Sequence, residues 1–216
     1  MQKNKKYFGI VYNAPVTLTF ALLCVAELIF QSKFSPAFRQ LFIAPSRPGT
    51  EMALLFKVPA QYLRLFLHVF AHSDIEHLIS NLSFLLLLGP GLEDRFGGPL
   101  LALMMLTTAF ATAVINACFM STGILGASGI VFMMILLSSY TTIDRSQIPL
   151  TFVLICILYI GNEITSLKTE TASGIAALAH ITGGICGSLF GFLTVPEKKT
   201  VTRRKAAPKE PPKPTE

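Results

Sequence analysis

The sequence predicts an all-α fold: a polytopic membrane helix bundle with six transmembrane helices. Of its 216 residues, 52% are hydrophobic and only 14% are charged, whereas a soluble domain carries roughly 25% charged residues. The mean hydropathy of +0.59 agrees with a chain that lies mostly in lipid. The apolar residues gather in six runs, and a transmembrane helix needs about 20 such residues. The runs cover residues 14–30, 75–92, 99–120, 128–142, 149–164 and 173–195.

Local signals mark where several of these helices begin. Pro15, Pro99 and Pro149 stand at the start of their runs, where the missing N–H of proline costs nothing. Ser73-Asp74-Ile75-Glu76 has the capping-box pattern S-x-x-E, which predicts that the second helix begins close to Ile75. The fourth run is short, so its helix crosses the bilayer only if its first residues lie below the membrane surface.

The composition divides the chain into three parts. We expect residues 1–13 to form a cytoplasmic N-terminal segment, residues 14–195 the membrane domain, and residues 196–216 a disordered basic cytoplasmic tail. The first connection of the domain, residues 31–74, is long and too apolar for water. It should therefore lie in the membrane interface beside the bundle, where its prolines break it into short pieces.

The basic residues predict the orientation and the partners. With both termini in the cytoplasm, twelve Lys and Arg residues fall on the cytoplasmic side and six on the outer side, as the positive-inside rule favours. The basic residues behind the net charge of +6 lie at the chain ends and in the loops. This distribution favours anionic lipid rather than nucleic acid as the binding partner. We expect an integral multi-pass protein of a bacterial-type plasma (inner) membrane, with an organelle membrane as the alternative.

The cysteines do not indicate metal or disulfide chemistry. All four lie within apolar runs, and none has the spacing of a metal-ligand set. They fit buried small apolar side chains. We therefore expect no disulfide framework, no metal and no cofactor.

Polar residues inside the apolar runs are the candidate functional residues. Ser128 heads the fourth run within Gly126-Ala127-Ser128-Gly129. His180 lies seven residues into the sixth run, about 10 Å down at about 1.5 Å per residue. His77 and Asn81 lie one turn apart on one face of the second helix. The second, fourth and sixth helices all run inward from the outer face, so these residues are expected to share one depth.

Each of these residues alone has an ordinary structural explanation, since small and polar side chains also pack between membrane helices. Together at one depth they indicate nucleophilic catalysis. Neutral histidine is a suitable base for a serine hydroxyl at about pH 7, and free N–H groups at a helix start favour a developing oxyanion. His77 and Asn81 are candidate side-chain donors there. Glu93 and Asp94 belong to the opposite side, so we expect a Ser-His dyad without an acid.

Four motifs follow one another along the predicted helices. They are His77-x-x-x-Asn81, Glu93-x-Arg95-x-Gly97, Gly126-Ala127-Ser128-Gly129 and Ala179-His180-x-x-Gly183. In this order the motifs resemble those of the rhomboid family of intramembrane serine proteases, and Arg64 matches the arginine of the family's Trp-Arg pair in the first connection. The resemblance covers roughly residues 14–195. Each motif alone is weak, but their order and spacing across three helices are specific.

The resemblance implies a role for each residue of the site. Ser128 is expected to be the nucleophile and His180 the general base. His77, Asn81 and the backbone N–H of Ser128 are expected to surround the oxyanion.

The resemblance also implies supporting residues, namely Gly126, Gly129, Phe132 and Gly183. The pattern Gly183-x-x-x-Gly187-x-x-x-Gly191 would let the sixth helix approach the fourth closely. The family often has tyrosine where this chain has Phe132, whose ring can still pack against His180 but carries no hydroxyl. Leu63 replaces the tryptophan of the loop pair. His68 and His72 match loop histidines of some relatives.

Two functions follow from this pattern. The first is an intramembrane serine endopeptidase that cleaves transmembrane segments of membrane proteins near the outer face. The second is a catalytically inactive rhomboid-like protein that binds membrane clients, and the presence of both Ser128 and His180 counts against it. A small transporter is disfavoured, because the two halves show no repeat.

Overall fold

The computed structural model describes residues 12–141, 150, 153–154, 157 and 172–194. The predicted helix at 149–164 and both predicted terminal segments lie largely outside these residues. Within the described residues the regular elements are helices, and an isolated β-bridge pairs Ser46 with Ala53.

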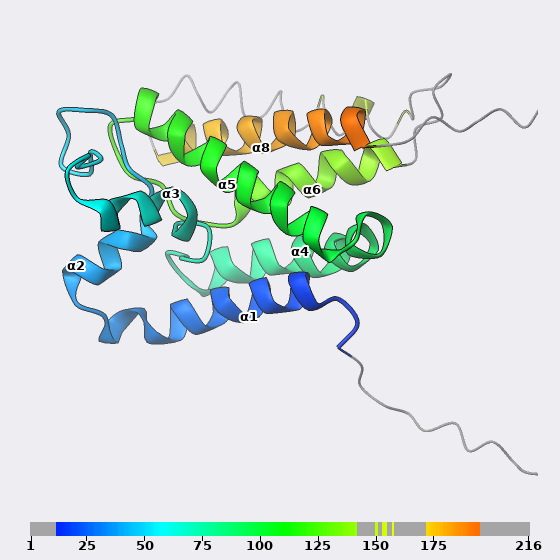
Figure 1. Cartoon of the computed structure of the whole chain (residues 1–216), viewed down its shortest axis with the longest axis horizontal. Coiled ribbons are helices and arrows are strands. Elements are labelled where there is room, and N and C mark those ends of the chain that lie inside the picture. Colours follow the sequence, from blue (N-terminus) through cyan, green and yellow to red (C-terminus); the bar gives the residue numbers. More distant parts are fainter. Residues whose placement is uncertain (1–11, 142–149, 151–152, 155–156, 158–171, 195–216) are drawn as a thin grey trace, which may run out of the picture.

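Within the described residues, five long helices form the bundle. They are α1 (Pro15–Phe30), α4 (Ile75–Phe96), α5 (Gly98–Phe119), α6 (Ser128–Thr141) and α8 (Ala172–Thr194). Figure 1 shows α1 alongside α4 and α6 alongside α8, with α5 crossing between the two pairs and touching both. The core between them contains fully buried side chains from three helices, including Leu85, Met104 and Met133.

The described helices make the chain a multi-pass membrane protein. Four segments are long and apolar enough to cross a bilayer: Pro15–Lys33, Ile75–Phe96, Gly98–Phe119 and Ala177–Thr194. The apolar helix Ser128–Tyr140 is shorter than these. Since most of the predicted fifth helix lies outside the described residues, the total of six spans stays a prediction.

The second predicted helix, α4, begins at Ile75 as expected, but Ser73 is not its cap. Asp74 is the N-cap, and its Oδ1 accepts the backbone N–H of His77 at 2.8 Å. The Ser73 hydroxyl donates to the other carboxylate oxygen of Asp74 at 2.6 Å. The carboxylate of Asp74, at the N-cap position, satisfies one of the free N–H groups of the first turn, and Ser73 hydrogen-bonds to that carboxylate instead.

The opposite end of α4 holds the start of α1. The Glu93 carboxylate accepts the backbone N–H groups of Val16 at 2.9 Å and Thr17 at 3.0 Å, and the Thr17 hydroxyl at 2.9 Å. A carboxylate at a helix N-terminus satisfies free donors and meets the positive end of the helix dipole. Glu93 of the Glu93-x-Arg95-x-Gly97 motif therefore ties the two helices together.

Short helical pieces make up the first connection. They are η1 (Gln31–Lys33), α2 (Pro36–Arg39), η2 (Gln40–Phe42), η3 (Pro59–Leu63) and α3 (Arg64–Leu67). Arg64 is 1% exposed, and its guanidinium donates to the carbonyl oxygens of Ile43 at 2.8 Å and Met52 at 2.9 Å. Leu63, which replaces the tryptophan expected from the resemblance, is 49% exposed. Arg64 rather than residue 63 therefore organises the connection.

We expect Arg64→Met to lower the free energy of unfolding by about 3 kcal/mol or more. The substitution leaves at least two carbonyl groups of the connection, and the side-chain oxygen of Gln61 at 3.0 Å, without their donor. Unfolding in detergent, followed by circular dichroism, measures the change. Arg47→Met is the matched control because Arg47 is exposed, and an equal loss in both variants would contradict the role of Arg64.

Candidate active site

The helices α6 and α8 meet at glycines close to Ser128. A Cβ placed on Gly183 of α8 would collide with the carbonyl oxygen of Gly129, and one on Gly187 would collide with that of Met133. A Cβ on Gly129 would in turn lie 3.3 Å from the carbonyl oxygen of Ala179. The backbone of α8 therefore lies directly on the first turn of α6, the turn that Ser128 begins.

A ring stack places His180 beside that turn. The Phe132 and His180 rings stack with centroids 4.1 Å apart and an interplanar angle of 5°. Ser128 and Phe132 are four residues apart in α6, so they lie on one face of the helix. The imidazole of His180 is thus packed one turn from Ser128, on the face that Ser128 shares.

His77 approaches the same region from α4. Gly126, two residues before Ser128, has φ +123°, and a Cβ there would lie 2.8 Å from Cε1 of His77. Only glycine combines this backbone conformation with room for the ring.

Asn81 lies one turn deeper on α4, and its side chain is 5% exposed. Its amide nitrogen donates to the carbonyl oxygen of His77 at 3.2 Å. One of its two N–H groups is therefore used within the helix.

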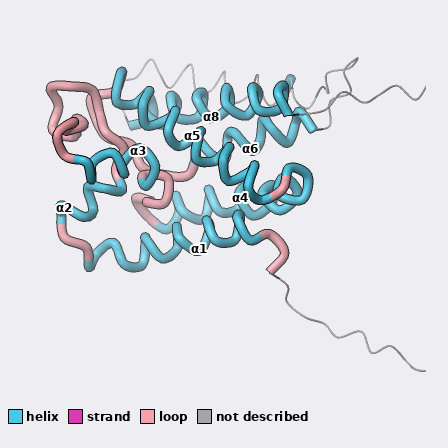
Figure 2. Tube along the Cα trace, viewed as in Figure 1, coloured by secondary structure: helices cyan, strands magenta, loops and turns pink. Residues whose placement is uncertain are grey.

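The first connection fixes the backbone that leads into Ser128. The backbone N–H of Gly126 donates to the carbonyl oxygen of His68 at 3.0 Å, and that of Ala44 donates to Ile124 at 2.8 Å. The Asn116 side chain donates to the carbonyl oxygens of Pro45 at 2.9 Å and Thr122 at 3.0 Å. Figure 2 shows these loop segments gathered at one end of the helices. The connection thus sets the position from which α6 starts.

His68 and His72 are both buried in the connection. Each is 1% exposed, and each turns Nδ1 toward a backbone carbonyl oxygen at 3.2 Å, that of Arg64 for His68 and that of Phe70 for His72. Burial lowers the pKa of His68 to about 4. Its ring is therefore neutral at about pH 7.

The burial of His68 predicts a loss of stability in acid. The unfolded chain protonates His68 below its ordinary pKa of 6.5, whereas the folded chain does so only near 4. The contribution of neutral His68 to the free energy of unfolding is thus complete above about pH 6.5. As the pH falls towards 4, this contribution is lost, and the free energy of unfolding decreases by up to about 3 kcal/mol. Unfolding free energies measured between pH 7.5 and 4 test this, and His68→Gln should flatten the slope. An unchanged slope in His68→Gln would contradict it.

Sequence reasoning did not single out Glu27, a buried acidic residue of α1. Glu27 lies in the last turn of α1, on its buried face, and is 7% exposed. The spacing in the sequence indicates that Glu27 is buried, because it follows Phe20 and Cys24 at intervals of four and three residues on the helix face that packs against the bundle.

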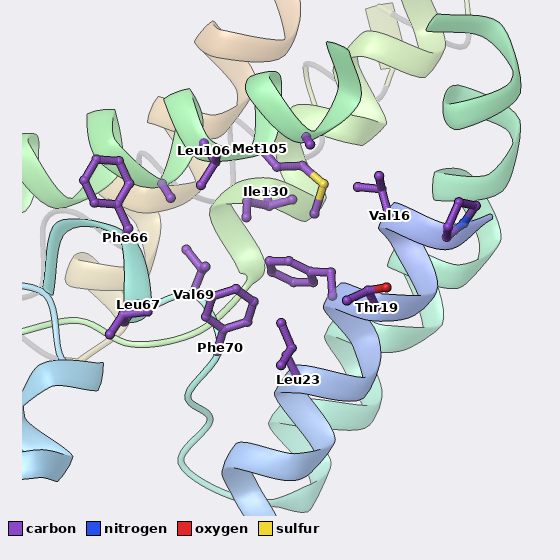
Figure 3. A pocket seen from close by; sticks show the side chains of 14 residues that line it. Val16, Thr19, Leu23, Phe66, Leu67, Val69, Phe70, Met105, Leu106 and Ile130 are labelled. Atoms are coloured by element: carbon purple, nitrogen blue, oxygen red, sulfur yellow. The ribbon is translucent and has the colours of Figure 1, made fainter. Parts of the chain in front are cut away.

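An apolar cavity of about 480 Å³ lies away from the candidate catalytic residues, between α1, α5 and the end of the first connection. Figure 3 shows Thr19 and Leu23 of α1 facing Val69 and Phe70 across it, with Ile130 of α6 at its inner side. Its lining carries almost no polar group, so it offers no catalytic chemistry. Among the described residues, no group of three or more His, Cys, Asp or Glu side chains is placed to hold a metal ion.

These observations define a class of protein, an all-helical, multi-pass membrane protein. In it, a serine at a helix start and a histidine on a neighbouring helix lie close to the point where glycines let the two helices touch. The family model described as the Rhomboid domain matches residues 59–197. The chain belongs to the rhomboid family.

Three curated relatives from Arabidopsis thaliana show how far the similarity extends. RHOMBOID-like protein 6, mitochondrial, is 29% identical over 181 residues, which cover 79% of this chain and 57% of the relative. RHOMBOID-like protein 1 is 25% identical over 79% of this chain and 45% of the relative. RHOMBOID-like protein 4 is 28% identical over 130 residues, which cover 56% of this chain and 31% of the relative. The chain thus spans about half the length of the curated relatives it matches, or less.

Proposed function

We propose that the protein is an intramembrane serine endopeptidase that cleaves transmembrane segments of membrane proteins near the outer face. Ser128 is the nucleophile and His180 the general base. The observation that carries this proposal is the stack of His180 on Phe132, one turn from Ser128, at the glycine contact of α6 and α8. Membership of the rhomboid family supports the same assignment.

The proposed reaction is acyl transfer through the serine. His180 takes the hydroxyl proton as the Ser128 oxygen attacks the carbonyl carbon of the scissile peptide bond. The backbone N–H of Ser128 stabilises the oxyanion of the tetrahedral intermediate, with His77 and Asn81 as side-chain donors. The intermediate collapses as His180 returns the proton to the leaving amine, and water then releases the acyl group by the same steps.

The proposed topology puts the site within reach of water from the outer side. Six spans within residues 14–195 place both termini, 1–13 and 196–216, in the cytoplasm and the connection 31–74 at the outer interface. We place the protein in a bacterial-type plasma membrane. A mitochondrial membrane is the alternative that the name of one relative raises. The partners are transmembrane substrates and the lipid bilayer.

The test is cleavage of a panel of single-span proteins by the purified chain, in detergent and in liposomes. We expect cleavage within or just outside the transmembrane segment, and none by Ser128→Ala. Cleavage retained in Ser128→Ala would reject the assignment. A wild-type protein that binds the panel without cleaving it would instead establish the inactive, client-binding alternative.

A further inference from the structure

Ser73 and Asp74 form a chain of hydrogen bonds that ends on the ring of His77. The Ser73 hydroxyl oxygen lies 2.6 Å from Oδ2 of Asp74 and 3.2 Å from Nδ1 of His77. The other carboxylate oxygen of Asp74 accepts the backbone N–H of His77 at 2.8 Å. Asp74 therefore holds His77 in two ways, through the backbone and through Ser73.

The direction of this chain follows from the charge of Asp74. Its hydrogen bonds with the Ser73 hydroxyl and the backbone of His77 hold the pKa of its carboxyl group below the usual range, so it is ionised at about pH 7 and can only accept. A distance of 2.6 Å is typical of a hydroxyl that donates to a carboxylate. Because a hydroxyl has one proton, Ser73 offers only its oxygen to His77. Nδ1 of His77 is therefore the donor in the 3.2 Å contact.

The opposite edge of the His77 ring faces the backbone that leads into Ser128. A Cβ placed on Gly126 would lie 3.0 Å from Nε2 of His77 but 4.0 Å from Nδ1. Nε2 is thus the ring nitrogen on the side of the nucleophile. A neutral imidazole carries one proton, so with that proton on Nδ1 the Nε2 atom has a lone pair and cannot donate.

Titratable groups on the neighbouring elements bear on the charge of His77. The His72 ring meets the His77 ring edge-on with centroids 5.0 Å apart, and burial lowers the pKa of His72 to about 4, so that ring is neutral at about pH 7. The helix α1, which packs against α4, carries one charged residue, Glu27, on its buried face. The helices α5 and α6 carry no charged residue, and α8 carries His180, the proposed base. The carboxylate that is hydrogen-bonded towards the His77 ring is that of Asp74.

We propose that Ser73 and Asp74 are positioning residues that fix the proton of neutral His77 on Nδ1. Since Nε2 then has no proton, His77 donates to the oxyanion only as the imidazolium, whose charge Asp74 balances through Ser73. This contribution is present at low pH and is lost when the ring gives up its second proton as the pH rises. The proton position follows from the hydrogen bonds alone, whereas the catalytic consequence rests on the proposed function.

Nitrogen NMR of the full chain labelled with ¹⁵N-histidine tests the proton position. The chain has four histidines, so single His→Gln variants assign the His77 signals. Protonated and bare ring nitrogens give well-separated signals. At a pH where His77 is neutral, we expect the proton on Nδ1 in the wild type. A proton on Nε2 there would overturn the proposal.

Asp74→Asn should move this proton to Nε2. Asparagine still caps the helix with its carbonyl oxygen, but its NH₂ group donates to Ser73, whose hydroxyl proton then turns to Nδ1 of His77. Glu76→Gln is the matched control, because it removes one exposed carboxylate from the same turn and changes no atom of the chain of hydrogen bonds. It should leave the proton on Nδ1. The same tautomer in the wild type and in Asp74→Asn would overturn the role of Asp74.

The pH dependence of kcat tests the catalytic consequence. Wild-type kcat should fall on the alkaline side, where His77 is neutral and Nε2 is bare. Asp74→Asn gives the neutral ring an N–H on Nε2, so its kcat at about pH 8.5 should exceed that of the wild type by about tenfold or more, since one oxyanion donor is worth about 10²–10³ in kcat. A merely structural role of Asp74 predicts a loss instead, and Glu76→Gln should keep the wild-type profile.

The two readouts separate this inference from the proposed function. A kcat of Asp74→Asn equal to or below that of the wild type at about pH 8.5 would overturn the catalytic consequence. If the wild type shows no proteolysis while the tautomers behave as expected, the proposed function fails and the proton position stands.

Discussion

Ser128→Ala and His180→Ala are each expected to lower the rate of substrate cleavage by about 10⁴-fold or more. The serine oxygen forms the bond to the substrate, and without a base its hydroxyl is a weak nucleophile. Residues that act as one unit also lose nearly all activity when either is removed. The double variant should therefore be no slower than the single ones, and initial rates on one purified substrate measure this.

Both variants should remain folded and inserted in the membrane. Ser128→Ala changes one hydroxyl at a helix start, and His180→Ala removes the ring that stacks on Phe132. Unfolding temperature and detergent solubility are the controls. Additive losses in the double variant would indicate that the two residues act independently, and would contradict the dyad.

Gly183→Ala is expected to disrupt the site, whereas Gly184→Ala should be tolerated. A Cβ at Gly183 would collide with the carbonyl oxygen of Gly129, but one at Gly184 would lie 3.8 Å from the Leu136 side chain, an ordinary contact. Separating α8 from α6 moves His180 away from the Ser128 turn. We expect Gly183→Ala to cost about 1–3 kcal/mol of stability and about a hundredfold in rate.

The two alanine variants form a matched pair, since they lie next to each other on one helix and add the same methyl group. Unfolding curves and cleavage rates of both are compared with the wild type. Equal activity of Gly183→Ala and the wild type would show that the close approach of the helices is not required.

Local patterns were sufficient to predict where the helices begin. The helices α4 and α6 start at Ile75 and Ser128 as predicted, because caps and apolar runs act over a few residues. Asp74 rather than Ser73 is the cap because the helical backbone begins at Ile75, one residue later than the pattern S-x-x-E would place it. The motifs along three helices were also sufficient to predict the rhomboid family.

The interior of the first connection could not be predicted in the same way. Arg64 binds carbonyl groups 12 and 21 residues away, at Met52 and Ile43, and backbone carbonyls leave no mark in a sequence. The burial of Glu27 likewise depends on how α1 packs against the connection, through Phe20 on Phe70 and Cys24 on Val69.

The most direct test of the dyad is labelling with a fluorophosphonate, followed by mass spectrometry to find the modified residue. We expect one adduct on Ser128 in the wild-type protein and none in His180→Ala at the same probe concentration. An adduct on another serine, or full labelling of Ser128 in His180→Ala, would contradict it.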